Sequence, residues 1–136
     1  MRVVLVATDF SEVSERAEGR AGELARSMEA RLHLVHVVEP IDDPEQADEE
    51  TREFHRSLEV RASRLLQERI GQWTGLSVTY SVVLGHRPQS ILRVADQEEA
   101  DVLVLGTHPV GEGEQPRGST SQRVSWFSRR PVLLVP

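Results

Sequence analysis

The sequence predicts an α/β fold built on a parallel, doubly wound sheet. Short apolar runs alternate along the chain with longer amphipathic stretches. The runs at 3–7, 102–105 and 132–135 are apolar throughout, which is typical of strands that helices cover on both faces. Strands joined by helices take right-handed crossovers and therefore lie parallel. The 136 residues are enough to bury a sizeable core, and we expect one domain over 1–136.

The first half of the chain predicts two strands and two helices. VVLVA at 3–7 reads as a buried strand, and apolar residues at helical spacing predict a helix over about 12–29. RLHLVHVV at 31–38 is the second strand. The acidic, proline-containing stretch at 39–50 predicts an exposed loop, which leads into a helix over about 46–70.

The second half continues the alternation. LSVTYSVVL at 76–84 predicts the third strand, and a helix over 86–100 follows, opening near a proline that the first turn tolerates. DVLVLG at 101–106 is the fourth strand. A long loop, a short helix over about 119–128 and the strand PVLLV at 131–135 complete the chain.

Composition excludes several classes of function. All 16 basic residues are Arg and there is no Cys, so lysine Schiff bases, the phosphate-binding lysine of a P-loop and thiolate chemistry are absent. The formal net charge of −6 argues against a nucleic-acid partner, which would need a basic face. The apolar runs are too short for membrane insertion, and the chain begins with a strand pattern rather than a signal peptide. We therefore expect a cytoplasmic protein.

Asp9 follows the first strand in the stretch ATDFSEVSERA. It can be a solvated residue beside a helix cap formed by Ser11 or Ser14, and residue types alone favour that interpretation. Alternatively, its carboxylate accepts hydrogen bonds from a sugar hydroxyl or a base amine. In open α/β sheets ligands bind beyond the carboxyl ends of the strands, where the strand order reverses. If the strand order is 3-2-1-4-5, the ends of the first and fourth strands are neighbours at that point.

The stretch GSTSQRV at 118–124 predicts an anion site. Gly118 allows close approach of the backbone, and the N–H groups of Ser119, Thr120 and Ser121 point out of a helix start, where the helix dipole favours an anion. Simple N-capping needs only one of these hydroxyls. Three in succession therefore favour the anion site over the cap alone.

The loop before that helix supports two interpretations. Gly106, Gly111 and Gly113 permit a phosphate cradle, whereas Pro109 has no N–H to donate and neighbouring acidic residues would repel a phosphate. An exposed loop is the alternative. His108 lies near the proposed site, although an exposed loop histidine is the commoner case. The five His residues do not form a metal constellation, and we expect neither a metal site nor catalytic residues of a hydrolase.

Four stretches together resemble the universal stress protein family over essentially the whole chain: VLVATDFSEVSERA, LHLVHVVEP, VVLGHRPQSILRVADQEEADVLVLGTH and GSTSQRVSWFSRRPVLLVP. The resemblance implies five parallel strands in the order 3-2-1-4-5. It also implies a homodimer through the last strand, 131–135, whose apolar edge would otherwise be exposed.

The nucleotide-binding branch of that family carries the pattern G-x2-G-x9-G-[S/T]. Gly106 matches its first glycine and Gly118 with Ser119 its end, while the second glycine falls on Pro109 and the loop is one residue shorter. Gly111 is the alternative flexible point. The resemblance implies that adenosine lies along Ala7, Thr8 and Asp9 and that the Val37 backbone holds adenine. It also implies that Gly106 and His108 flank the ribose and phosphates. The phosphates themselves would be held by Gly118, Ser119, Thr120 and Ser121.

The resemblance implies a stress-response regulator that binds an adenine nucleotide, with ATP as the first candidate and ADP or AMP as alternatives. Glu112 and Glu114 could hold Mg²⁺ near the phosphates, but the sequence favours a solvated loop at these two residues. A second hypothesis is a nucleotide-free module that regulates a protein partner such as a transporter or a signalling enzyme. A third is a slow ATPase, for which the sequence offers no clear catalytic base. We therefore expect no enzyme.

Overall fold

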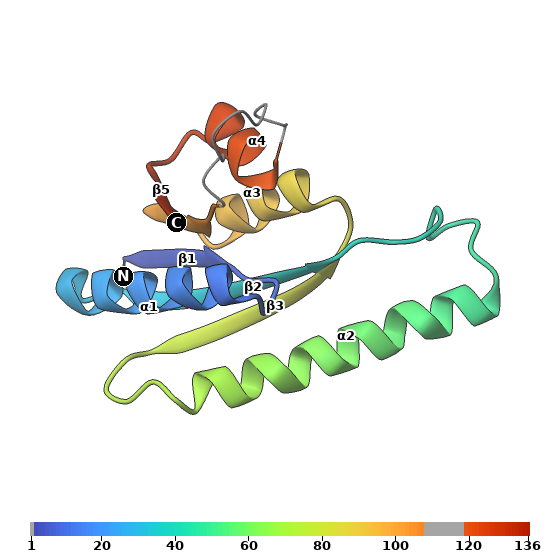
Figure 1. Ribbon diagram of the computed structural model, residues 1–136, viewed down its shortest axis with the longest axis horizontal. Coiled ribbons are helices and arrows are strands. Elements are labelled where there is room, and N and C mark those ends of the chain that lie inside the picture. The colour runs from blue at the N-terminus through green and yellow to red at the C-terminus, as the bar shows by residue number, and fades with distance from the viewer. Residues whose placement is uncertain (1, 108–118) are drawn as a thin grey trace.

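The computed structural model describes residues 2–107 and 119–136. In these residues five parallel strands form one sheet in the order β3-β2-β1-β4-β5, which confirms the expected fold (Figure 1). The elements follow in chain order: β1 Val3–Ala7, α1 Glu12–Met28, β2 Arg31–Val38, α2 Glu49–Ile70, β3 Val78–Leu84, α3 Arg87–Gln97, β4 Val102–Gly106, α4 Thr120–Phe127 and β5 Val132–Val135.

Helices cover both faces of the central strands. Neighbouring side chains of a strand point to opposite faces, so β1 contributes to two separate cores. Val4 and Val6 pack with the alanines of α1 and with Leu66 of α2. Val3 and Leu5 pack with the apolar faces of α3 and α4. Figure 1 shows the same division, with α1 and α2 on one side of the sheet and α3 and α4 on the other.

The second helix begins later than the sequence predicted. Asp48 caps α2 by accepting a hydrogen bond from the backbone N–H of Thr51 at 2.8 Å, and the helix therefore starts at Glu49 rather than near 46. Its amino-terminal half projects beyond the sheet (Figure 1). This position explains why the apolar side chains of Phe54 and Val60 are 46% and 59% exposed.

The last strand differs from the expectation that 132–135 is covered on both faces. Among the residues that the structure describes, β5 is an edge strand that pairs with β4 alone, and its Leu133 and Leu134 side chains are each 41% exposed. The expectation is wrong for this strand because apolarity alone cannot distinguish a strand covered by helices from one at the edge of the sheet. Trp126 and Phe127, at the end of α4, are also exposed, at 69% and 70%.

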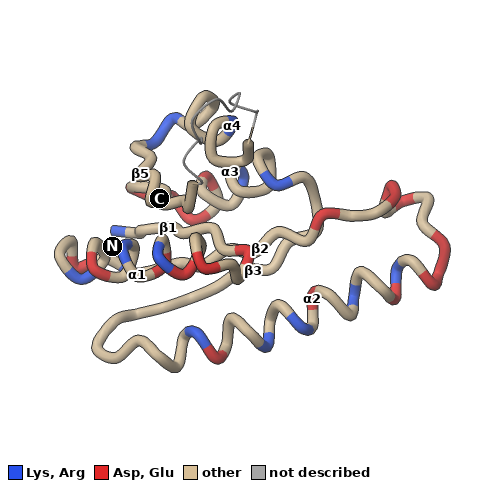
Figure 2. The backbone as a smooth tube through the Cα atoms, in the orientation of Figure 1, with Lys and Arg blue, Asp and Glu red and all other residues tan. Residues whose placement is uncertain are grey.

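Charges of both signs are spread over the helices, while acidic residues gather along the connection between β2 and α2 (Figure 2). Among the residues that the structure describes, no helix combines the length and apolarity needed to cross a membrane.

Candidate functional site

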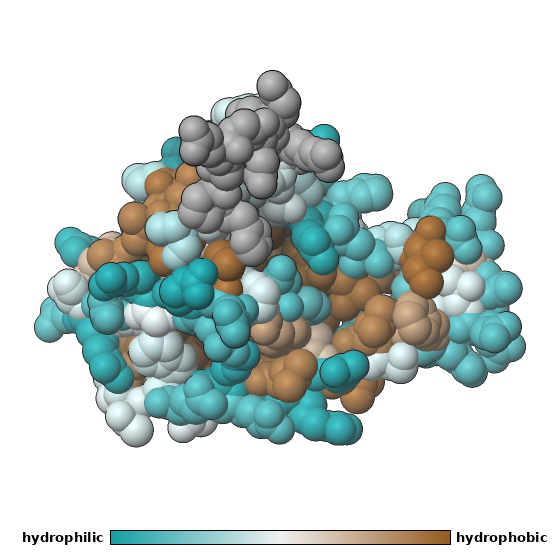
Figure 3. Space-filling model, viewed as in Figure 1, coloured by the Kyte–Doolittle hydropathy of each residue, from teal (hydrophilic) through white to brown (hydrophobic). Residues whose placement is uncertain are grey.

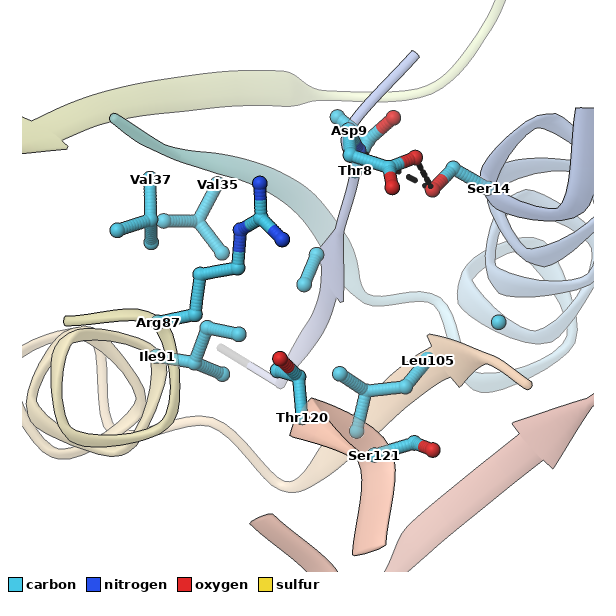
Figure 4. Close-up of a pocket in the computed structure, with 12 residues that line it drawn as sticks. Thr8, Asp9, Ser14, Val35, Val37, Arg87, Ile91, Leu105, Thr120 and Ser121 are labelled. Carbon is cyan, nitrogen blue, oxygen red and sulfur yellow. Dashed lines mark hydrogen bonds between the residues drawn. The ribbon is translucent and has the colours of Figure 1, made fainter. Parts of the chain in front are cut away.

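A cavity of about 100 Å³ lies at the carboxyl ends of β1, β2 and β4, where the strand order reverses (Figure 4). Seven of the predicted site residues line it together: Ala7, Thr8, Asp9, Val37, Gly106, Thr120 and Ser121. Val35, Ile91 and Leu105 form apolar walls. The topology thus brings together segments that are far apart in the sequence, as expected for an open α/β sheet.

Asp9 lies beside the cap of α1 and also lines the cavity. Ser11 caps α1, and Oδ1 of Asp9 accepts hydrogen bonds from the Ser14 hydroxyl at 2.6 Å and from the Ser11 N–H at 3.0 Å. Among the described residues no hydrogen bond reaches Oδ2. The carboxylate therefore organises the start of the helix with one oxygen and leaves the other available in the cavity (Figure 4).

The carboxyl group of Asp9 is ionised under all ordinary conditions. Partial burial acts to raise its pKa, but hydrogen bonds from Ser11 and Ser14 and the positive charge of Arg87 outweigh burial and lower the pKa to about 2. An ionised carboxylate only accepts hydrogen bonds. The group thus presents an anionic acceptor that suits hydroxyl or amino groups of a ligand.

Packing alone already requires a glycine at position 106. A side-chain carbon built at this position would lie 2.5 Å from Cγ1 of Val13 and 3.0 Å from its carbonyl oxygen. The glycine is therefore required where α1 crosses the end of β4, independently of any ligand. Gly106 still borders the cavity, but its lack of a side chain is explained by packing.

The start of α4 is more heavily bonded than the sequence indicated. Ser119 caps the helix and forms a capping box with Gln122: the Ser119 N–H donates to Oε1 of Gln122 at 3.3 Å, so it is not free. Ser121 is 5% exposed, and its hydroxyl contacts those of Ser119 and Thr107 at 3.0 and 3.4 Å. Thr120 is the residue whose hydroxyl points into the cavity (Figure 4).

Arg87 is a site residue that the sequence analysis missed. It opens α3, lines the cavity, and extends its guanidinium group toward the Asp9 side of the cleft (Figure 4). Nε of Arg87 lies 3.3 Å from a carboxylate oxygen of Glu39, and both side chains are nearly half exposed. The sequence offered one indication of this role: Arg87 follows the carboxyl end of β3, which lies on the same edge of the sheet as the cavity.

A second cavity, of about 440 Å³, lies beside the first and shares Asp9, Val37 and Arg87 with it. Part of its remaining wall comes from α2, including Leu58 and Leu65. Figure 3 shows apolar surface along this side of the molecule. The open space beside the carboxyl end of β2 is therefore larger than the first cavity alone.

Several predicted positions lie outside the described residues: His108, Pro109, Gly111, Glu112, Glu114 and Gly118. Within 2–107 and 119–136, no group of three or more His, Asp or Glu side chains is arranged to hold a metal ion.

The family model that describes the universal stress protein family matches residues 1–136. The universal stress protein in the QAH/OAS sulfhydrylase 3' region of Thermus aquaticus is 34% identical, with 98% of each chain covered. The solved structure of universal stress protein UspA from Lactobacillus plantarum has a TM-score of 0.83 at 21% identity and covers 99% of this chain and 97% of its own. A solved universal stress protein in complex with cAMP has a TM-score of 0.74 at 23% identity, covering 99% and 97%. The chain belongs to the universal stress protein family.

Proposed function

We propose that this chain is a stress-response regulator that binds an adenine nucleotide in the cleft at the ends of β1 and β4. ATP is the first candidate, and ADP and AMP are the alternatives. The observation that carries the proposal is Asp9, whose carboxylate is ionised and keeps Oδ2 available in the cavity. Such an acceptor pairs with ribose hydroxyls or with the adenine amino group.

The walls of the cleft suit the base of a nucleotide. Val35, Val37, Ile91 and Leu105 offer apolar surface to a flat ring. The Thr120 hydroxyl and the first amides of α4 lie at the other end, where a helix start favours an anionic phosphate. A member of the same family has been solved in complex with cAMP, which supports an adenine nucleotide as the class of ligand.

Cavity size bears on which nucleotide binds. Ligand sites typically enclose roughly 300–1,000 Å³, and the first cavity measures about 100 Å³. A bound nucleotide must therefore extend beyond it, and the adjoining 440 Å³ beside Arg87 offers space. A nucleotide with a shorter phosphate chain needs less of this space. AMP and ADP therefore belong in every binding test beside ATP.

We also propose that two copies pair through β5. An edge strand with two exposed leucines is a surface that a second strand can cover. Trp126 and Phe127, at the end of α4, are two further exposed apolar side chains. Aromatic residues are enriched in the cores of protein interfaces.

A nucleotide-free module that regulates a protein partner is the second candidate. The small size of the first cavity and the exposed apolar side chains of Ile41, Phe54 and Val60 favour it. Both candidates describe a regulator rather than an enzyme. Slow ATP hydrolysis would have to depend on the cleft and therefore on Asp9.

The test is isothermal titration calorimetry of nucleotide-stripped protein with ATP, ADP and AMP. We expect binding by the wild type and a loss of roughly 10- to 150-fold in affinity for Asp9→Asn, because a hydrogen bond to a charged group contributes about 1.5–3 kcal/mol. Asp43→Asn is the matched control, since Asp43 makes the same backbone contact, to the N–H of Glu45 at 3.0 Å, away from the cleft. No heat with any nucleotide at millimolar concentration would favour the nucleotide-free module.

A further inference from the structure

We propose that Glu18 and Arg69 are positioning residues for the nucleotide site. Their buried ion pair joins α1 to α2 and holds the turn formed by Thr8, Asp9 and Phe10. The inference rests on the proposed function for its ligand. It adds that the affinity of the cleft is set in part by α2, a helix that contributes no side chain to the first cavity.

The Glu18–Arg69 ion pair is largely buried and has a well-defined geometry. The Glu18 side chain on α1 is only 4% exposed, and Nη1 of Arg69 lies 2.7 Å from each of its carboxylate oxygens. Nη2 of Arg69 also reaches Glu15 at 3.0 Å, but the Glu15 side chain is 55% exposed. A buried, hydrogen-bonded ion pair has one favoured geometry, whereas an exposed pair contributes little.

Glu18 reaches the cleft through Thr8. The Thr8 hydroxyl donates to Oε2 of Glu18 at 3.0 Å and accepts the N–H of Phe10 at 3.1 Å. The Thr8 N–H donates to the carbonyl oxygen of Val35 at 2.9 Å, and its carbonyl oxygen accepts from Nδ1–H of His36 at 2.8 Å. Every polar group of this 5%-exposed residue is engaged, and Thr8 directly precedes Asp9.

Phe10 shows that the turn needs such support. Its φ is +67°, a left-handed conformation that is unfavourable for a bulky residue and persists only where the surroundings enforce it. The Phe10 ring lies 4.6 Å from the His36 ring, and the Arg69 guanidinium carbon is 5.8 Å from its centre. Arg69 thus supports the turn both directly and through Glu18.

These contacts predict a selective effect of removing the charge on Glu18. The turn would lose its fixed geometry, and Asp9 would lose the position from which Oδ2 faces the cleft. The apolar walls of the first cavity and the start of α4 would keep theirs, because they belong to β2, α3, β4 and α4. Removing the Glu18 charge should therefore weaken nucleotide binding only when Asp9 is present.

The affinity test is a double-mutant cycle by calorimetry with AMP. We expect Glu18→Gln to weaken binding about tenfold in the wild type and less than about twofold in an Asp9→Asn background, since the two changes act on one interaction. Glu15→Gln removes the exposed partner of the same arginine and should change affinity less than about twofold. Equal losses from Glu18→Gln in both backgrounds, or no loss in either, would overturn the proposal.

A second measurement needs no nucleotide and separates this proposal from the proposed function. Amide hydrogen exchange of the ligand-free protein should speed up about tenfold at Phe10 in Glu18→Gln but not in Glu15→Gln, while the Leu32 amide in β2 keeps its rate. Unchanged exchange at Phe10 overturns the positioning role, even in a protein that binds nucleotide. Faster exchange at Phe10 in a protein that binds none supports the positioning role and refutes the proposed ligand.

Discussion

Replacing Gly106 with alanine tests whether this glycine serves packing or a ligand. The added carbon would stand 2.5 Å from Cγ1 of Val13 and 3.0 Å from its carbonyl oxygen, distances that force α1 to shift against β4. Overpacking of this kind costs about 1–3 kcal/mol. For a chain of this length the unfolding temperature should fall by about 3–10 °C.

Thermal and urea unfolding measure this effect, and two further variants sharpen it. Gly19→Ala adds the same carbon inside α1 with nothing within 4 Å, and it should stabilise the protein by about 0.5–1 kcal/mol. Val13→Ala removes Cγ1 but leaves the carbonyl oxygen, so it should rescue Gly106→Ala only in part. A Gly106→Ala protein as stable as the wild type, with weakened nucleotide binding, would refute the packing explanation.

Three other predictions follow from burial and charge. Burial lowers the pKa of His33 below 6.5 in the folded protein. As the pH drops below about 6.5, the unfolded chain therefore takes up a proton that the folded protein excludes. The free energy of unfolding should fall until the pH reaches the folded pKa. Urea unfolding of His33→Gln should show a weaker loss between about pH 7 and pH 5 than the wild type, and an equal loss would contradict this. Ser14→Ala removes the 2.6 Å hydrogen bond to Asp9 and should raise the pKa of that carboxyl group from about 2 toward 3.8, measured by NMR titration; an unchanged pKa would assign the shift to other contacts. Light scattering should show a dimer that Leu134→Glu dissociates. Val60→Glu, at a more exposed apolar position on α2, should leave the dimer intact, and dissociation by both substitutions would contradict β5 as the interface.

The sequence was informative about the sheet because buried parallel strands are continuous apolar runs. The alternation of strands and helices predicted parallel pairing, and the resemblance supplied the strand order. Local chemistry that acts within a few residues was also readable, as Ser11 beside Asp9 shows. Exact helix starts were not, because Asp48 could cap α2 only once the preceding loop had been placed.

The contacts missed by the sequence join residues that are distant along the chain. The packing role of Gly106 was missed because nothing in a linear sequence shows that Val13 packs against it. The direction of the Arg87 side chain depends on how α3 docks on the sheet. Glu18 reads as one more charged residue of an amphipathic helix, although it is nearly fully buried against Arg69.

The most direct test of the nucleotide cleft is an NMR titration of the ¹⁵N-labelled protein with ATP and AMP, following each backbone amide. We expect saturable binding, with the largest shift changes at Ala7–Asp9, Val37 and Ser119–Ser121, and smaller changes in the same amides for Asp9→Asn. Shifts that do not saturate at millimolar nucleotide, or that concentrate at the exposed end of α2 around Phe54 and Val60, would contradict it.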